Sequence, residues 1–473
     1  MRLLTDVTPL REHPAFRRLW LGAMLSRTGS AMTTFAVTLQ VYDLTRSPAA
    51  VGGIGAVTLV PLLLVTLPGG TLADRLDRRR LVLAVTVGQA AISATLFALA
   101  GAGASLWSLY ALVAAGSTLG AVSAPAQQTF IPRLVPTAQL GQAMALNRIV
   151  FQVAAIVGPS LAGVIAAWGG LRGCYLADVA SFTGALWSVA RLPAMLSETS
   201  TAAPDAADST ATDSGIADSA AEEGAAEEGG QRRSGLALTL EGLAFIGRTP
   251  VLCGAFLADV NATFFGLPVS LFPAINAARF GGNPRTLGLF MTAIGVGGLV
   301  SAVLSGPLRH ARRHGLVMLA CVAVWGGGFA LFAVAPSLWL TLLALAVAGL
   351  ADTFTVVVRG IIVQEATPER LRGRVNAADF LVGAGGSQLG ALEAGLVGSL
   401  TTPVVSALSG GLATVVGAAA IGALLPAFRR YHSPAPYGPG GQEPEPQLET
   451  VNDVVNSCAE AAAAAGTESS GAR

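Results

Sequence analysis

The sequence has little charge and contains no lysine. Charged residues make up 12% of its 473 residues, about half of the roughly 25% found in an ordinary soluble domain. A chain of this length would predict about three soluble domains, and so few charges could not cover three such surfaces. All 29 basic residues are arginine. We attribute this bias to genome composition and predict no nucleic-acid partner from it.

Cysteine is also scarce, and the familiar catalytic motifs are missing. The four cysteines are scattered without disulfide or metal-ligand spacing; they are Cys174, Cys253, Cys321 and Cys458. The sequence has no P-loop, no HExxH or CxxC pattern and no GxSxG elbow. We therefore predict no metal, no cofactor and no enzymatic activity, and expect any energy input to come from a proton gradient rather than from ATP.

Long apolar runs are abundant. Hydrophobic residues make up 52% of the chain and its mean hydropathy is +0.61. Runs of about 20 residues, the length that crosses a bilayer, predict an all-α polytopic membrane protein with twelve spans in two pseudo-symmetric six-helix bundles. The predicted spans lie at 18–42, 50–72, 81–101, 105–127, 143–167, 172–192, 250–275, 286–308, 315–335, 337–361, 374–399 and 403–427.

The arginines predict the orientation of these spans. Short cytoplasmic loops carry an excess of Arg. If the N-terminus is cytoplasmic, 21 arginines fall in inside segments and four fall outside, at Arg46, Arg172, Arg279 and Arg285. The start of the chain has no cleavable signal pattern. We therefore expect a multi-pass protein of the inner (cytoplasmic) membrane with both termini in the cytoplasm, monomeric in the lipid bilayer.

Two segments differ in composition from the rest. Residues 193–248 and 429–473 are rich in Ala, Ser, Gly and acids, and such sequences bury too little apolar surface to fold. We predict a cytoplasmic N-terminus (1–17), an N-terminal bundle (18–192), a disordered acidic linker (193–248), a C-terminal bundle (249–428) and a disordered cytoplasmic tail (429–473). An offset of 232 residues aligns Pro136 with Pro368 and Gly141 with Gly373, which favours two duplicated halves.

Charged residues inside the spans are the candidates for coupling or substrate binding, because ionisable groups in a membrane are costly and usually serve a function. The same offset aligns Arg27 with Asp259, and we predict that the two face each other, either as a proton- or substrate-sensing pair or as a static ion pair. Further candidates are Asp178, Asp352 and Asp379. Arg359 shares a helix face with Asp352 but lies near a predicted cytoplasmic end, where its side chain could extend to water.

Two motifs carry a family resemblance. The segment GGTLADRLDRRR at 69–80 resembles the signature loop of the major facilitator superfamily, and GPSLAG at 158–163 resembles the Gly-Pro motif of its antiporters. The resemblance implies a cytoplasmic gate formed by Gly70, Asp74, Arg75 and Arg78, and helix bending at Gly158 and Pro159. The alternatives are an arginine cluster that only sets topology and an ordinary proline kink. In the second half His310 replaces the gating acid, and we interpret His310 and His314 as solvated loop residues.

The order of these motifs, with FRRLWLGAMLSRTGSAM near the start and ATPERLRGRVNA near residue 370, looks like the enterobactin (siderophore) exporter and drug efflux branch of that superfamily. The resemblance implies a secondary transporter that exports a small molecule, such as a catecholate siderophore, by proton-coupled alternating access. A catecholate is acidic, which would give a buried Arg27 a role. The alternatives are a multidrug or antibiotic efflux antiporter, a metabolite importer and a membrane scaffold that transports nothing.

Overall fold

The protein is known from a computed structural model, which describes residues 7–66, 77–191, 235–304 and 313–432. All regular elements in these ranges are helices. The first half, which we define as residues 7–191, contains α1 (Thr8–Glu12), α2 (Pro14–Thr45), α3 (Pro48–Thr66), α5 (Arg78–Ala102), α6 (Leu106–Gln128), α7 (Phe130–Leu134), η1 (Thr137–Gln139) and α8 (Leu140–Ala190). The second half, residues 235–432, contains α10 (Gly235–Arg248), α11 (Pro250–Phe265), η3 (Val269–Leu271), α12 (Phe272–Phe280), α13 (Pro284–Leu304), α14 (His314–Val334), α15 (Leu338–Ala366), α16 (Glu369–Leu400), α17 (Pro403–Leu424) and α18 (Pro426–Arg429).

Nine helices in the described ranges are long and apolar enough to cross a bilayer, which confirms the predicted all-helical, multi-pass membrane fold. The number twelve stays a prediction. The helix α8 counts once in this set although it has two arms, and the apolar part of α3, Pro48–Leu64, is slightly too short to qualify. The helix α2 is absent from the set, and its sequence explains why: Gly, Ser and Thr interrupt its apolar residues.

The two arms of α8 are separated by a sharp bend at Gly170. This residue has φ 68° and ψ −179°, whereas the other residues of the 51-residue helix keep helical dihedrals. A positive φ suits glycine because it has no Cβ. Beyond the bend the arms pack against each other, and the Cys174 thiol donates to the carbonyl oxygen of Ala162 at 3.4 Å. The bend therefore turns one continuous helix into the two antiparallel spans predicted at 143–167 and 172–192.

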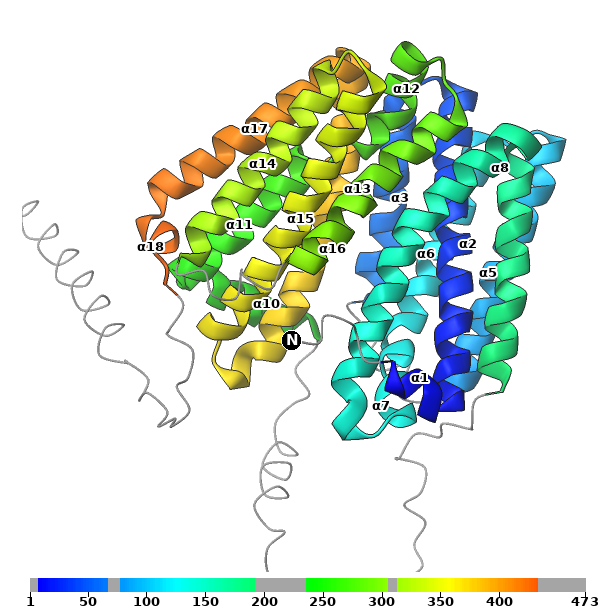
Figure 1. The fold of residues 1–473 in the computed structure, drawn as a ribbon, viewed down its shortest axis with the longest axis horizontal. Coiled ribbons are helices and arrows are strands. Elements are labelled where there is room, and N and C mark those ends of the chain that lie inside the picture. The colour runs from blue at the N-terminus through cyan, green and yellow to red at the C-terminus, as the bar shows by residue number, and fades with distance from the viewer. Residues whose placement is uncertain (1–6, 67–76, 192–234, 305–312, 433–473) are drawn as a thin grey trace, which may run out of the picture. The chain divides into compact units, whose positions relative to one another are not determined.

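Helices within each half pack mainly on one another. In the first half α2 packs on α8, α8 on α5, and α3 and α5 on α6. In the second half α14 packs on α15 and α17, α13 on α15, and α11 on α16 and α17. The halves are joined mainly by two helix pairs, α3 with α16 and α8 with α13, with smaller contacts of η3 with α3 and of α12 with α2 (Figure 1).

Both pairs that join the halves are antiparallel and depend on glycine. A Cβ at Gly52 would lie 2.6 Å from the carbonyl oxygen of Ala391, and one at Gly288 would lie 2.6 Å from that of Pro159. Small residues of this kind let membrane helices approach closely. These approaches cluster near the start of α3, which follows Arg46, and near the bend of α8 at Gly170. The arginine distribution predicts that this side of the helices lies outside the cell. We call the helix ends on this side the predicted outer ends.

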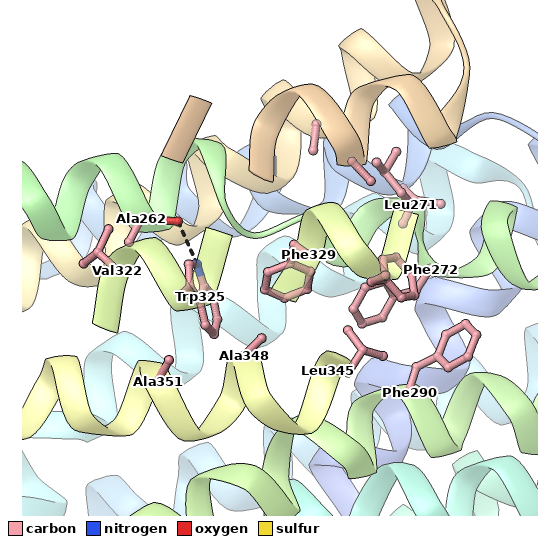
Figure 2. Close-up of a cluster of buried hydrophobic side chains, with 14 of the residues drawn as sticks. Ala262, Leu271, Phe272, Phe290, Val322, Trp325, Phe329, Leu345, Ala348 and Ala351 are labelled. Atoms are coloured by element: carbon pink, nitrogen blue, oxygen red, sulfur yellow. Dashed lines mark hydrogen bonds between the residues drawn. The ribbon is translucent and has the colours of Figure 1, made fainter. Parts of the chain in front are cut away.

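The core of the second half is aromatic. The ring of Phe272 lies 5.9 Å from that of Phe290 and 5.1 Å from that of Phe332, measured between centroids. The Trp325 indole nitrogen donates to the carbonyl oxygen of Ala262 at 3.2 Å, so its polar atom is satisfied inside the core (Figure 2). Edge-to-face and tilted rings of this kind contribute roughly 0.5–1.5 kcal/mol per pair beyond the apolar area they bury.

The last described helix, α18, is wedged between two others. Phe428 is fully buried, and a Cβ at Gly254 of α11 would overlap its ring, whereas a Cβ at Gly315 of α14 would overlap its carbonyl oxygen. The Tyr431 hydroxyl then donates to Glu365 Oε2 on α15 at 3.2 Å. Residues 426–431 are therefore fixed to three helices of the second half, α11, α14 and α15.

Three predicted boundaries are wrong. The tail was predicted to be unstructured from residue 429, but Arg429 is the last residue of α18 and the Tyr431 hydroxyl bonds to Glu365 of α15. The linker was predicted to be unstructured through residue 248, but residues 235–248 form α10, which packs on α16. Ile246 is buried there, and Glu241 forms an ion pair with Arg374, so this short segment has both an apolar and a charged contact. The span predicted at 250–275 ends earlier, because α11 stops at Phe265 and a separate helix, α12, follows.

Candidate functional site

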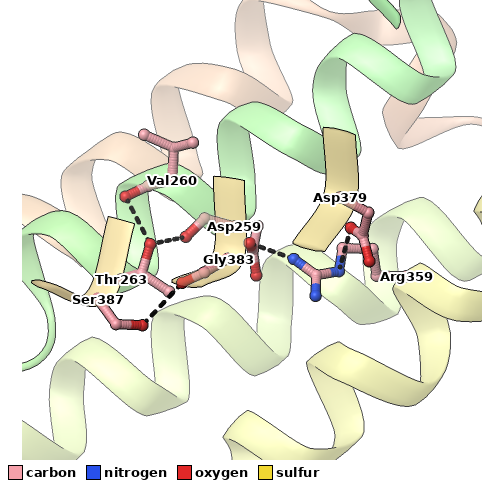
Figure 3. A network of polar contacts seen from close by, with 7 residues as sticks. All are labelled: Asp259, Val260, Thr263, Arg359, Asp379, Gly383 and Ser387. Atoms are coloured by element: carbon pink, nitrogen blue, oxygen red, sulfur yellow. Dashed lines mark hydrogen bonds and ion pairs between the residues drawn. The ribbon is translucent and has the colours of Figure 1, made fainter. Parts of the chain in front are cut away.

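The most concentrated group of charges inside the helices surrounds Arg359 on α15. Its guanidinium forms an ion pair with Asp259 of α11, and its Nε lies 3.4 Å from Asp379 Oδ1 of α16. Figure 3 shows the guanidinium between the two carboxylates. We call Asp259, Arg359 and Asp379 the ionic cluster. Three separate helices therefore meet at one charged contact.

The close packing of α11 on α16 brings the cluster together. A Cβ at Gly386 would lie 2.5 Å from Thr263 Oγ1, and a Cβ at Gly390 would overlap the carbonyl oxygen of Thr263. The Thr263 hydroxyl donates to the carbonyl oxygen of Asp259 at 2.9 Å, so its own polar atom is satisfied. Because glycine is present at both positions, α11 comes near enough to α16 for Asp259 and Asp379 to reach the same arginine.

The cluster is largely removed from solvent. The side chains of Asp259 and Arg359 are 7% and 11% exposed, and that of Asp379 is 31% exposed. A fourth residue, Asp352, interacts electrostatically with Asp259 and Arg359. If all were ionised, three acids would face one base. Charges in such a place are stable only when paired, and losing one partner of a buried pair costs about 3–5 kcal/mol.

The predicted pairing of Arg27 with Asp259 is wrong. Asp259 pairs with Arg359 instead, and the Arg27 guanidinium lies 3.6 Å from the ring centre of Phe151. The reason is helix packing: α2 packs mainly on α8, whereas α11 packs on α16 and α17. Among the described residues Arg27 forms no ion pair. It is held by a cation–π contact, which is worth roughly 0.5–2 kcal/mol.

Arg359 was one of the further candidates from the sequence, with extension of its side chain to water as the alternative. In the structure it is buried and central to the ionic cluster. The signal that could have found it is its shared helix face with Asp352, because a buried arginine near an acid on the same face needs a partner from a neighbouring helix. No pattern in the sequence indicates which helix supplies that partner.

Asp178, on the second arm of α8, is the buried acid of the first half. Its Oδ2 accepts hydrogen bonds from Thr33 and Ser93, each at 2.7 Å, and its Oδ1 accepts one from Ser181 at 3.2 Å. The residue is 1% exposed, and among the described residues no arginine pairs with it. It is held by three hydroxyl groups from α2, α5 and α8.

Gly158 and Pro159 lie on the first arm of α8 and are buried. Gly158 faces Ala31 of α2, and Pro159 presents its carbonyl oxygen to Gly288 of α13. The helix keeps helical dihedrals at both residues, since Gly170 is its one non-helical position. The structure thus places Pro159 at a junction between the halves, and its predicted role in bending stays a prediction.

The predicted cytoplasmic gate falls mostly outside the described residues. This applies to Gly70, Asp74 and Arg75, and to the side chain of Arg78; His310 also lies outside. Within the same segment, Asp77 caps α5 by accepting a hydrogen bond from the Arg79 amide at 2.9 Å. His314, predicted to be a solvated loop residue, is buried in the first turn of α14.

No group in the described ranges brings together three His, Cys, Asp or Glu side chains that could hold a metal ion. The charged candidate residues that the structure describes are buried or partly buried. In the second half Arg359 lies between two carboxylates, and in the first half Arg27 and Asp178 form no ion pair with each other. Such groups can exchange partners, bind an anion or take up a proton.

Comparisons with known proteins cover almost the whole chain. A family model described as "Transmembrane secretion effector" matches residues 4–210, and one described as "Major Facilitator Superfamily" matches residues 251–457. Proteins named Enterobactin exporter EntS, from Citrobacter koseri and Salmonella typhi, are each 26% identical to the chain, over 439 and 442 residues. These matches cover 92% and 93% of this chain, and 98% and 99% of those proteins.

Solved structures of transporters have the same fold. The nucleoside transporter NupG gives a TM-score of 0.63 at 15% identity, covering 87% of this chain and 98% of that one. A bacterial homologue of the iron transporter ferroportin, in an inward-facing state, gives 0.60 at 16% identity, covering 88% and 99%. At these identities the likeness concerns the fold alone.

Proposed function

Because this chain belongs to the major facilitator superfamily and is a transporter rather than an enzyme, we propose that it exports a siderophore of the enterobactin type in exchange for protons. The observation that carries the proposal is the end-to-end similarity to proteins named enterobactin exporters, which extends through both halves. The resemblance of Gly158 and Pro159 to the antiporter motif supports the outward direction.

Arg27 and Phe151 are our proposed substrate contacts. A catecholate is both aromatic and acidic, so it suits an arginine that lies over an aromatic ring. Arg27 has no acidic partner among the described residues, and Phe151 is 51% exposed. A bound anion would therefore pair with Arg27 without first displacing a carboxylate.

The ionic cluster is our proposed coupling group. Protonation of Asp259 would neutralise the main partner of Arg359, which would leave the guanidinium to Asp379 and Asp352 and change how α11, α15 and α16 hold together. One proton moving down a potential of 100 mV supplies about 2.3 kcal/mol. This is enough for roughly a fortyfold substrate gradient.

Rocking of the two halves would expose the substrate to each side in turn. The junctions of α3 with α16 and of α8 with α13 are closest towards the predicted outer ends, at pairs such as Gly52 with Ala391 and Gly163 with Pro284. We infer that the structure represents a state closed on the outside. Release of the substrate would require these glycine-lined junctions to separate.

Transport into inverted membrane vesicles tests this function. Vesicles containing the protein should accumulate labelled enterobactin when an acid-inside proton gradient is imposed. The accumulation should stop when a protonophore collapses the gradient. The Arg27→Met variant should lose this uptake while remaining folded. Accumulation of an antibiotic without enterobactin would favour the drug efflux alternative, and enterobactin flux out of the inverted vesicles would favour an importer.

A further inference from the structure

An open pocket of about 410 Å³ lies at the ends of α14 and α18, apart from the ionic cluster and from Arg27. Its lining is strongly basic and consists of Arg313, Leu316, Arg429, Arg430 and His432. Three arginines in one small pocket attract an anion, because each guanidinium offers several hydrogen-bond donors in a planar fork.

These arginines have no acid to neutralise them in the part of the chain that the structure describes. None of the ion pairs there includes Arg313, Arg429 or Arg430. Glu365 on α15 accepts a hydrogen bond from the Tyr431 hydroxyl at 3.2 Å. Burial and Glu365 both raise the pKa of Tyr431, so the phenol keeps its proton and the donor role.

The α18 side of the pocket is anchored to neighbouring helices. Phe428, just before the two adjacent arginines, is wedged between Gly254 and Gly315, and Tyr431, just after them, is tied to α15. Figure 1 shows α18 directly beyond the end of α17. Arg429 and Arg430 are therefore anchored on both sides, next to Arg313 at the start of α14. A preorganised site of this kind binds without first ordering its own backbone.

One exposed leucine lines the basic pocket, and another lies on the helix that leads into α18. Leu316 lines the pocket and is 44% exposed. Leu424 is the last residue of α17, two residues before α18 begins, and is 79% exposed. Both lie on helices with the length and composition of membrane spans. In a bilayer, exposed leucines on a span would face the lipid chains, and arginines at the ends of spans would lie near the headgroups.

We propose that this pocket binds the phosphate of an anionic phospholipid, with the acyl chains lying along Leu316 and Leu424. The orientation predicted by the arginines places it in the cytoplasmic leaflet. This lipid site does not depend on which molecule is transported.

The acidic tail of the chain could compete with a lipid phosphate for the basic pocket. Residues 433–473 carry six acids and one arginine, and they follow His432 directly. The lipid fits better because an acidic peptide would satisfy the arginines but leave the two leucines uncovered. A soluble phosphate compound would leave them uncovered as well.

The test uses the purified full-length protein in detergent and measures lipid binding by native mass spectrometry. The lipids are phosphatidylglycerol and phosphatidylcholine with identical acyl chains. Replacing Arg429 and Arg430 together by Gln should weaken phosphatidylglycerol binding by about 25-fold, taking roughly fivefold for each arginine. The matched control is Arg17→Gln with Arg18→Gln, which removes the same charge at the start of α2 and should bind as the wild type does. If the double variant fails to fold, Arg429→Gln alone should show about a fivefold loss.

Four results would overturn the proposal. Phosphatidylcholine could bind as tightly as phosphatidylglycerol, or the control could lose as much affinity as the pocket variant. Glycerol phosphate could bind as tightly as the lipid, which would assign the pocket to a soluble phosphate. Finally, phosphatidylglycerol could bind only after removal of residues 433–473, which would assign the pocket to the acidic tail.

Discussion

In the first half of the chain Arg27 and Asp178 are kept apart, whereas in the second half Arg359 and Asp259 form an ion pair. Arg27 lies over the ring of Phe151, and Asp178 is surrounded by hydroxyl groups. Arg359 instead lies between two carboxylates from two other helices. The same residue types inside a membrane protein are thus stabilised in two different ways.

The difference matters because the two arrangements respond differently to the loss of a charge. A carboxyl group held only by hydroxyl donors keeps most of its contacts when an amide replaces it. An arginine between two carboxylates leaves both uncompensated when it is removed. The first half should therefore tolerate neutral replacements that the second half does not.

The largest effect should come from Arg359→Met. It leaves Asp259 and Asp379 without their base, and we expect a loss of about 3–5 kcal/mol in the free energy of unfolding. Arg27→Met, the matched change in the first half, should cost only about 0.5–2 kcal/mol, since it removes one cation–π contact. Denaturant unfolding of both purified variants measures this; equal losses would contradict the contrast between the halves.

Asp259→Asn removes the charge of this side chain while keeping nearly the same size. Asp259→Asn should cost about 1.5–3 kcal/mol because it removes the charge from the shortest contact of Arg359, and it should abolish proton-driven uptake. Asp379→Asn should cost less, because Asp379 lies at 3.4 Å and is 31% exposed. Uptake into inverted vesicles at several pH values is the readout. Unchanged uptake and pH dependence in Asp259→Asn would remove Asp259 from the coupling mechanism.

The close approach of α11 to α16 can be tested without changing any charge. Gly390→Ala should cost about 1–3 kcal/mol, because the new methyl group overlaps the Thr263 carbonyl oxygen and pushes the helices apart. Gly383→Ala on the same helix is the control, since its Cβ would lie 3.9 Å from Arg359 Nη2. It should stabilise the helix by about 0.4–1 kcal/mol. Similar thermal unfolding of both variants would mean that the spacing of α11 and α16 is not what holds the cluster.

The smallest effect should come from Asp178→Asn. The amide oxygen can still accept from Thr33 and Ser93, so we expect a change of less than about 1 kcal/mol. Asp178→Leu should cost more, because three hydroxyl groups lose their acceptor. If Asp178→Asn destabilises the protein as much as Asp259→Asn does, the acid of the first half is paired with a cation after all.

The sequence predicted the fold more fully than the site. Apolar runs and the Gly-Pro element were enough for a helical membrane transporter, because these signals are local. The pairing of Arg27 with Asp259 was wrong because a repeat offset aligns positions within each half but does not say which helices touch. The partner of Asp259 lies 100 residues further along the chain and depends on the glycines of α16, whose effect appears only once helices pack.

For Asp178 the sequence identified the buried acid but not the residues that contact it. The sequence identified it as a charge inside a span, but its three hydroxyl donors come from α2, α5 and its own helix. Serine and threonine are frequent in these spans and most bond to the backbone of their own helix. Nothing in the sequence marks Thr33 and Ser93 as the two that turn towards the acid.

Phe428 sets a practical limit on shortening the protein. A chain cut after Leu424 would lose the ring that fills the space beside Gly254 and Gly315, and removing a buried aromatic side chain costs about 3–5 kcal/mol. A cut after His432 keeps every contact of α18 with the residues that the structure describes. Affinity tags and fusion partners for purification or imaging therefore belong beyond residue 432, and Phe428 should be retained in any shortened form.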